Sequence, residues 1–395
     1  MHTDTPTDGQ HEDARRRRGL FFVGAAVVGV GFALAIQVGC NDNFVVGELK
    51  VVSGLDKGVL EAVRESCGVA ALGLLALLAG FAEPLVGAAM VALFGVGLAS
   101  YCTVPTFGWL LAASLVWSQG LHVWMPLPDS MTMGMAEPGR VGFRLGQMRA
   151  AGSAGFGAGM VAAFALTSLR VPLRPLFVLA GAVGLLAAAA CLGIPRDLKT
   201  PGPRLIFRRR YGLYYALCFL DGWRRQIFLC FAGFLLVRVY HTPVQTILLL
   251  YLVVQVVGYL GFPWLGRLID RVGERRVLVV YFACVTVVFI GYAVIRERAV
   301  LFALFLADSI LSGCATAITT YVHRIAPPSE HTATLGMGVA MNHVAAVAMP
   351  LLGGFLWQHA GYQWVFVAGI VAAAASMLVA LRVPRASAAA AADVG

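Results

Sequence analysis

The feature that most constrains this chain is a series of apolar stretches of ~20 residues, a length that lets a helix cross the ~30 Å hydrocarbon core of a bilayer. The 395 residues are 59% hydrophobic and only 13% charged, about half the charged fraction of a soluble domain. The mean hydropathy is +0.80. We therefore expect an all-α membrane protein that crosses the bilayer many times.

Twelve stretches have the required length and apolar character. They lie, within a few residues, at 19–48, 56–82, 84–103, 106–128, 145–169, 173–194, 212–240, 243–265, 276–295, 299–322, 333–358 and 361–382. The four arginines at 15–18 precede the first stretch as in a signal peptide, but no A-x-A-type cleavage site follows. The pattern therefore predicts an uncleaved first helix and twelve transmembrane helices.

The arginines and lysines are unequally distributed between the two sides of the predicted membrane. Of the 30, twenty fall in segments on the side of the N-terminus, and seven, Lys57 among them, fall on the other side. Cytoplasmic loops of membrane proteins carry the excess of positive charge. We therefore expect a multi-pass protein of the cell membrane with both termini in the cytoplasm. The same clustering explains the net charge of +10 without a nucleic-acid partner.

The stretch from Pro195 to Arg210 is basic and contains three prolines, which is typical of a linker. It divides the chain into a disordered cytoplasmic tail at 1–18, a six-helix half at 19–194, a linker at 195–211, a six-helix half at 212–383 and a tail at 384–395. A Leu-Gly pair opens the fifth stretch of each half, at 145 and 335, seven residues after a proline. This echo favours two pseudo-symmetric halves.

A densely charged segment joins the eighth and ninth stretches. It reads GRLIDRVGERR from Gly266 to Arg276, and its two glycines, Gly266 and Gly273, permit a tight turn. Asp270 can accept hydrogen bonds at a helix N-terminus, and Arg271, Arg275 and Arg276 suit lipid headgroups and carboxylates. The segment resembles the G-x-x-x-D-R-x-G-x-R-R signature that joins helices 8 and 9 in the major facilitator superfamily.

The resemblance implies a monomeric secondary transporter with alternating access, and export is the commoner direction in the family. It places helices 1, 4, 7 and 10 around a central cavity and helices 3, 6, 9 and 12 at the periphery. The run from Pro350 to Gly354 resembles the family's P-x-x-G-G element, and Gln119-Gly120 resembles the end of its R-x-x-Q-G pattern. Val116 replaces the arginine of that pattern, so the coupling role of the arginine does not carry over. The loop at 80–84 also lacks the charged signature.

Charged side chains inside membrane spans cost roughly 2.5–3.5 kcal/mol each on insertion scales, so their positions indicate function. Here they fall on stretches that the resemblance places at or beside the cavity: Glu61, Arg64, Glu65, Asp221, Arg224, Arg225 and Asp308. Stretches 3, 6, 9 and 12 carry no ionisable residue in their interiors. This distribution is expected for a water-filled pathway.

Asp221, Arg224 and Arg225 have the i, i+3 and i+4 spacing of one helical face. One carboxylate leaves one arginine without a counter-charge, which favours a substrate with an anionic group. The alternative is a self-neutralising ion pair that holds the helix to a neighbour. On the second stretch, Glu61, Arg64 and Glu65 form a similar group with a spare carboxylate, which suits a gate or a binding element.

Asp308 has no basic residue within one turn on its own stretch. Such a carboxylate is either paired across helices or protonated, because burial disfavours its charged form. We expect coupling protons on the carboxylates Asp221, Asp308, Glu61 and Glu65. The predicted substrate site adds the polar and aromatic residues Gln119, His122, Trp124, Asn342 and His343. A purely structural, hydrogen-bonded His343 is the alternative.

Methionines suggest a second function. Met131, Met133 and Met135 form an M-x-M-x-M run near His122, and thioethers with imidazole are ligands suited to Cu(I). A soft-metal transporter is therefore an alternative, although methionine is also an ordinary filler of helix packing. The eight cysteines contain no C-x-x-C pair. We expect neither a bound metal nor a cofactor.

The predicted function is a proton-coupled carrier of a small organic molecule, which can be anionic. A membrane enzyme is disfavoured because the sequence has no zincin, nucleophile-elbow or phosphate-loop motif. A membrane sensor is disfavoured because no soluble output domain is evident.

The predicted topology can be tested with cysteine reporters and membrane-impermeant maleimides. Reporters beside Arg204 and Arg275 should react only from the cytoplasm, and one beside Arg296 only from outside, because the positive-inside rule orients the twelve spans. Opposite accessibility at any of the three positions would contradict the twelve-span count.

Overall fold

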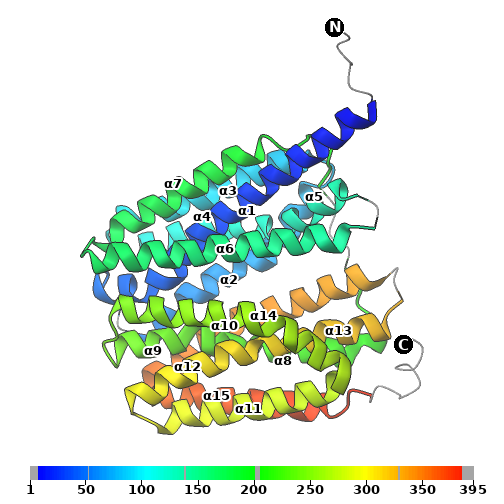
Figure 1. Ribbon diagram of the computed structural model, residues 1–395. Helices are drawn as coiled ribbons and strands as arrows, with labels where there is room; N and C mark the ends of the chain where they lie inside the picture. The colour runs from blue at the N-terminus through cyan, green and yellow to red at the C-terminus, as the bar shows by residue number, and fades with distance from the viewer. Residues whose placement is uncertain (1–7, 52, 138, 201–204, 328–329, 385–395) are drawn as a thin grey trace. The chain divides into compact units, whose positions relative to one another are not determined.

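The computed structural model describes residues 8–51, 53–137, 139–200, 205–327 and 330–384. Within these residues every regular element is a helix, apart from one isolated antiparallel bridge between Ala82 and Lys199. The chain forms two compact units (Figure 1). Unit 1 comprises Met1–Phe44 and Ala70–Gly202, and unit 2 comprises Val45–Val69 and Pro203–Gly395.

Unit 1 is built from helices of the first half of the sequence, with α2 shared between the units. The helices are α1 (Asp8–Gly47), α2 (Gly54–Leu77), α3 (Glu83–Ala99), η1 (Ser100–Cys102), α4 (Phe107–Trp124), α5 (Leu127–Met135), α6 (Val141–Ser168) and α7 (Leu173–Cys191). Helix α3 packs along both α4 and α7, and α5 contacts α6.

Unit 2 contains the first part of α2 and the helices of the second half. They are η2 (Arg209–Tyr211), α8 (Gly212–Ile227), η3 (Phe228–Ala232), α9 (Gly233–Arg238), α10 (Val244–Val272), α11 (Glu274–Val294), α12 (Arg298–Leu311), η4 (Ser312–Ala315), α13 (Thr316–Ile325), α14 (His331–Ala360) and α15 (Tyr362–Ala380). Helix α8 packs along α14 and α15, and α11 packs along α15. The element η3 is a single π-helical turn between α8 and α9.

The prediction of an all-α membrane protein is confirmed. In the described part of the chain, nine helices are long and apolar enough to span a membrane. The predicted stretches that fall outside these nine are α2, α4 and the α8–η3–α9 run, and each carries polar or charged residues in its interior. With η1, η3 and η4 taken as bends inside a span, the described helices are consistent with the twelve predicted stretches.

Glycines allow the closest helix contacts, as expected where helices pack without a hydrophobic driving force. In unit 1, a Cβ on Gly155 of α6 would lie 2.2 Å from the Val28 carbonyl oxygen of α1. In unit 2, a Cβ on Gly58 of α2 would lie 2.1 Å from the carbonyl oxygen of Pro350, which lies inside the continuous helix α14. A side chain at either position would force the two backbones apart.

Several predicted boundaries were wrong. Helix α1 begins at Asp8, so the part of the predicted disordered tail from Asp8 onward is helical, while residues 1–7 lie outside the described residues. This first segment is stabilised by an i, i+4 ion pair between Glu12 and Arg16 at 2.5 Å and by a contact of Arg15 with Asp197. Most of the predicted C-terminal tail, 385–395, lies outside the described residues.

The charged signature lies mostly in helix and not in a loop. Helix α10 continues to Val272, so Gly266 lies within the helix. The turn is made by Gly273 alone, with a positive φ of 81° that glycine adopts without strain. The predicted stretch ended at 265, where the apolar residues end. Helix α10 continues to Val272, because a helix can extend beyond the apolar layer with polar side chains.

The described parts of the linker are each attached to their own unit. In unit 1, the Gly80 amide donates to the Thr200 carbonyl at 3.0 Å, and the Thr200 amide donates to Phe81 at 2.9 Å. In unit 2, Glu330 holds the residues just before α8 through the contacts Arg210 Nη2–Oε2 at 2.6 Å, Tyr211 Oη–Oε2 at 2.7 Å and Arg208 Nη2–Oε1 at 3.1 Å. We call this group the Glu330 anchor.

The Glu330 anchor should depend on pH. Hydrogen bonds from Tyr211 and then Arg210 lower the pKa of Glu330 below its ordinary value of 4.5. Because the pKa is lower in the folded state, the charged carboxylate stabilises the anchor at pH values above the ordinary pKa. This stabilisation is lost as the pH falls through the folded-state pKa. The anchor should therefore be intact at pH 7 and release only below about pH 4. Hydrogen exchange at the Ile206 amide, which donates to Ala333, should report this release.

The same release should occur at neutral pH in Glu330→Gln, which removes the charge but keeps the shape. Trypsin should then cut faster after the arginines at 208–210. The control is Glu12→Gln, which removes the exposed ion pair with Arg16 in unit 1 and should leave this rate unchanged. Equal rates in the wild type and Glu330→Gln would contradict the anchor.

Candidate functional site

A buried charge network joins three helices of unit 2. The Arg224 guanidinium of α8, fully buried, lies 3.3 Å from Asp221 Oδ1 on its own helix and 3.3 Å from Asp308 Oδ1 on α12. It also donates to the Tyr281 hydroxyl of α11 at 2.6 Å, and that hydroxyl donates to Asp221 Oδ1 at 3.1 Å. We call these four residues the Arg224 network.

The Arg224 network has more carboxylates than guanidinium groups. Asp221 and Asp308 face the single positive charge of Arg224, and both carboxylates are at most 5% exposed. Oδ2 of Asp308 is buried and has no hydrogen-bond partner among the described residues. One of the two carboxylates therefore has no counter-charge within the network, and an uncompensated charge is costly in an apolar interior.

The predicted pairing of Asp308 across helices is thus observed, with Arg224 as its partner. Tyr281 was missed, because it lies on a stretch that we expected at the periphery and without an ionisable residue. A tyrosine in an apolar helix is common, and only the positions of the neighbouring helices reveal that its hydroxyl meets a charge. The sequence contained no local signal for this contact.

The two arginines of α8 do not share a face, contrary to the prediction. Arg224 is buried, whereas Arg225 is exposed and makes no hydrogen bond or ion pair within the described part of the chain. The two arginines differ by about 100° in direction and lie on either side of Asp221, and Arg224 is the one that points into the interior. In this structure Arg224 has no solvent-accessible surface, whereas Arg225 does.

The charges of α2 also differ from the prediction. Lys57, which we assigned to an outside loop, lies within α2 and is 1% exposed. Its Nζ lies 2.8 Å from Glu61 Oε1, and Arg64 Nη1 lies 2.8 Å from the same oxygen. Glu61 thus bridges two cations. The other interior carboxylate, Glu65, lies 3.3 Å from Nδ1 of His343 on α14.

The other predicted substrate residues have mainly local partners. On α4, His122 Nδ1 lies 2.8 Å from the Ser118 carbonyl oxygen, and Trp124 is buried against Gly87. On α14, Asn342 donates to the Cys218 carbonyl of α8 at 3.4 Å. Gln119 is half-buried on α4. The α4 residues belong to unit 1 and the α14 residues to unit 2.

The methionine run does not form one site. Met131 and Met135 are buried on one side of α5, and Met133 is 52% exposed on the other. Alternate residues of a helix point about 200° apart, so the three sulfurs cannot converge on one ion. Met131 and Met135 instead fill the packing of unit 1. This run therefore supplies no single set of three thioether ligands.

The charged signature contributes an ion pair through Glu274 and not through the residues expected to act as a gate. Asp270 and Arg271 are exposed, and neither they nor Arg275 and Arg276 form an ion pair or hydrogen bond within the described residues. Glu274, the acidic residue within the signature, lies 3.4 Å from Arg324 at the end of α13. The predicted capping contact of Asp270 is therefore not formed within unit 2.

A polar ladder on α1 was also missed. Gln37 donates to Asn41 at 3.5 Å, and Asn41 donates to Asp42 at 3.2 Å. Gln37 and Asn41 are 4% and 5% exposed, so both are buried in an apolar helix. Treating carboxamides in the same way as charges would have found them, since α1 corresponds to a stretch that the resemblance places at the cavity.

Comparisons with known proteins agree with this architecture. Residues 214–394 match the sequence model of the Major Facilitator Superfamily. Curated protein sequences contain no match to the chain. Among solved structures, the nucleoside transporter NupG is 15% identical with a TM-score of 0.74, over 91% of this chain and 97% of that one.

Two further solved structures cover nearly the whole chain. A bacterial homologue of the human lysosomal transporter Spinster, in an inward-facing and occupied conformation, is 14% identical with a TM-score of 0.73, over 95% of this chain and 99% of that one. The peptide transporter POT is 13% identical with a TM-score of 0.72, over 99% of each chain. At such identities the likeness establishes the fold.

The family model covers the C-terminal half, the solved transporters share the fold over nearly the whole length, and the charged signature lies at the α10–α11 turn. The resemblance seen in the sequence is thereby confirmed, and the chain is a multi-pass membrane protein with the transporter fold of the Major Facilitator Superfamily.

Proposed function

We propose that this protein is a proton-coupled secondary transporter that moves a small organic molecule with an anionic group by alternating access. The observation that supports this most strongly is the excess carboxylate of the Arg224 network, fully buried at Asp308. A buried, ionisable group inside a membrane helix is costly and marks proton relays in transporters. Export is the proposed direction, following the commoner case in the family.

Proton binding would change the partners of Arg224. With Asp308 deprotonated, the guanidinium is shared between α8 and α12, at 3.3 Å from a carboxylate on each. With Asp308 protonated, the attraction to α12 weakens and Arg224 remains with Asp221 and Tyr281. The proton would thus alter the force between two helices that the family places at the cavity.

The π turn η3 begins at Phe228, three residues after Arg225, and lies between α8 and α9. Such turns are frequent at functional sites and interrupt the regular hydrogen bonding of a helix. A helix with such a turn can bend there at lower cost than a regular one. We propose that the part of α8 that carries Arg224 and Arg225 moves at this turn when the charge of the network changes.

Arg225 supplies the proposed substrate contact. It is exposed near the middle of the α8–η3–α9 run, and an exposed guanidinium is unfavourable against lipid at this depth. It should therefore face a water-filled space, where a carboxylate or phosphate can accept two of its hydrogen bonds. Solved transporters of this fold include proteins named for nucleosides, peptides and organic anions.

The coupling role of Asp308 can be tested by flux. Purified protein in proteoliposomes that enclose a pH-sensitive dye is exposed to a panel of organic anions, and wild-type protein should give proton movement with at least one of them. Asp308→Asn should still bind that anion, measured by thermal shift, but should not move protons or accumulate it, because the buried site no longer titrates. Asp129→Asn, an exposed carboxylate on α5, is the control. Wild-type coupling in Asp308→Asn would exclude this residue as the coupling site.

Substrate recognition gives a separate prediction for Arg225→Ala. Loss of a charge-assisted hydrogen bond of about 1.5–3 kcal/mol should weaken binding of the same anion about 10- to 100-fold. Isothermal titration measures the change. Arg238→Ala, at the end of α9, should bind with wild-type affinity. Equal affinity in Arg225→Ala and the wild type would show that the anionic group is bound elsewhere.

A further inference from the structure

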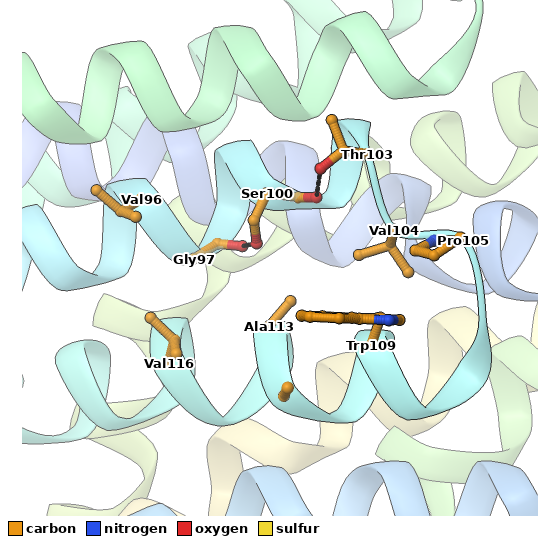
Figure 2. Close-up of a pocket in the computed structure, with 10 residues that line it drawn as sticks. Val96, Gly97, Ser100, Thr103, Val104, Pro105, Trp109, Ala113 and Val116 are labelled. Carbon is orange, nitrogen blue, oxygen red and sulfur yellow. Dashed lines mark hydrogen bonds between the residues drawn. The ribbon is translucent and has the colours of Figure 1, made fainter.

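A hollow of about 530 Å³ lies between α3 and α4 in unit 1, beside the turn that joins them (Figure 2). Its walls come from the last turn of α3, from the connecting residues and from the first three turns of α4. They include Val96, Ser100, Val104, Trp109, Ala112 and Val116. No residue of the Arg224 network or of the predicted substrate site contributes to it.

Residue size explains why the hollow forms. Gly97 brings the two helices into contact, because a Cβ there would lie 2.5 Å from the Trp117 backbone nitrogen. Beside this contact, Ala112 and Ala113 are too small to fill the space between the helices. The indole ring of Trp109 closes one end (Figure 2), and 64% of this side chain is exposed. The hollow is therefore an open groove with an aromatic end wall.

The two hydroxyl groups of the groove donate to backbone carbonyls of the groove itself. Ser100 Oγ donates to the Gly97 carbonyl at 2.7 Å, and Thr103 Oγ1 donates to the Ser100 carbonyl at 3.2 Å (Figure 2). The nearby Arg174 guanidinium donates to the Cys102 and Val104 carbonyls at 2.8 and 3.1 Å. The other lining side chains are hydrocarbon, apart from the indole N–H of Trp109 at the end of the groove. The lining therefore suits a hydrocarbon.

We propose that the groove binds one acyl chain of a phospholipid from the surrounding bilayer. Helix α3 belongs to the candidate span Glu83–Cys102, with a mean hydropathy of 2.0, so its exposed side chains at this level meet hydrocarbon. Trp109 lies at the end of the groove nearest the turn, and tryptophan is enriched at the boundary between hydrocarbon and headgroups. The charge distribution of the loops assigns this turn to the outer leaflet.

Packing gives the bound chain a longer residence time than its neighbours. An unfilled space of this size would leave the walls without dispersion contacts, and a flexible chain recovers them. On a convex helix surface a chain touches one side only, whereas in the groove it touches both α3 and α4. The groove should therefore be occupied by one chain in preference to the freely exchanging lipid around the protein.

Photolabelling tests this proposal without reference to transport. The protein is placed in nanodiscs of phosphatidylcholine with a diazirine near the middle of one acyl chain, irradiated, and mapped by mass spectrometry. The label should concentrate on Trp109, Ala112 and Val116 above its density at Leu85 and Ala89, which are exposed on α3 outside the groove. An equal density at both places would overturn the proposal.

Filling the groove provides the matched comparison. Ala112→Trp should lower the label in the groove to the density at Leu85, whereas Leu115→Trp, an exposed position on the same helix outside the lining, should leave it unchanged. Val116→Phe is a second filling variant if Ala112→Trp does not fold, as judged by its melting temperature. Label that persists in both filling variants would overturn the proposal. Label displaced by an amphipathic transport substrate would assign the groove to that substrate and not to lipid.

Discussion

The cost of an uncompensated charge in an apolar interior is the constraint on which the interior of unit 2 depends. Arg224 has no access to solvent, so its charge must be balanced by groups on neighbouring helices. It is met by Asp221 on α8, Asp308 on α12 and the hydroxyl of Tyr281 on α11. Hydrophobic side chains can slide past one another at little cost, whereas this network specifies which faces of three helices meet.

The same constraint makes the network responsive. Arg224 balances one carboxylate, and the second leaves the network with one negative charge in excess. The π turn at Phe228–Ala232 lies directly beyond the charged part of α8. The proposed coupling uses this excess charge, the bend beside it and the exposed Arg225. A purely structural ion pair would need only one of the two aspartates.

Hydropathy predicted the helices well because each must bury its backbone polar groups within one segment of bilayer length. It failed at α10, where the helix continues past the apolar layer to Val272. Spacing placed Asp221 and Arg224 together correctly, since both lie on one helix. It could not assign Asp308 to Arg224, separate Arg225 from Arg224, or find Tyr281, because these depend on which neighbour lies against each face. Lys57 was assigned to a loop because the predicted stretch begins at 56, directly before it. Helix α2 begins at Gly54 and includes Lys57.

The corresponding turns of the two halves are held in place by different interactions, a side-chain ion pair in one and backbone hydrogen bonds in the other. The α10–α11 turn keeps the charged signature, and Glu274 there lies 3.4 Å from Arg324. The corresponding loop at 80–84 has lost those charges, yet its backbone pairs with the linker, with Glu83 N donating to the Leu198 carbonyl at 2.8 Å. Backbone hydrogen bonds need no particular side chain, so the loss of the signature from the first loop leaves that loop anchored. A side-chain ion pair responds to charge and a backbone bridge does not, so of these two turns only the one between α10 and α11 should respond to protons or anionic groups.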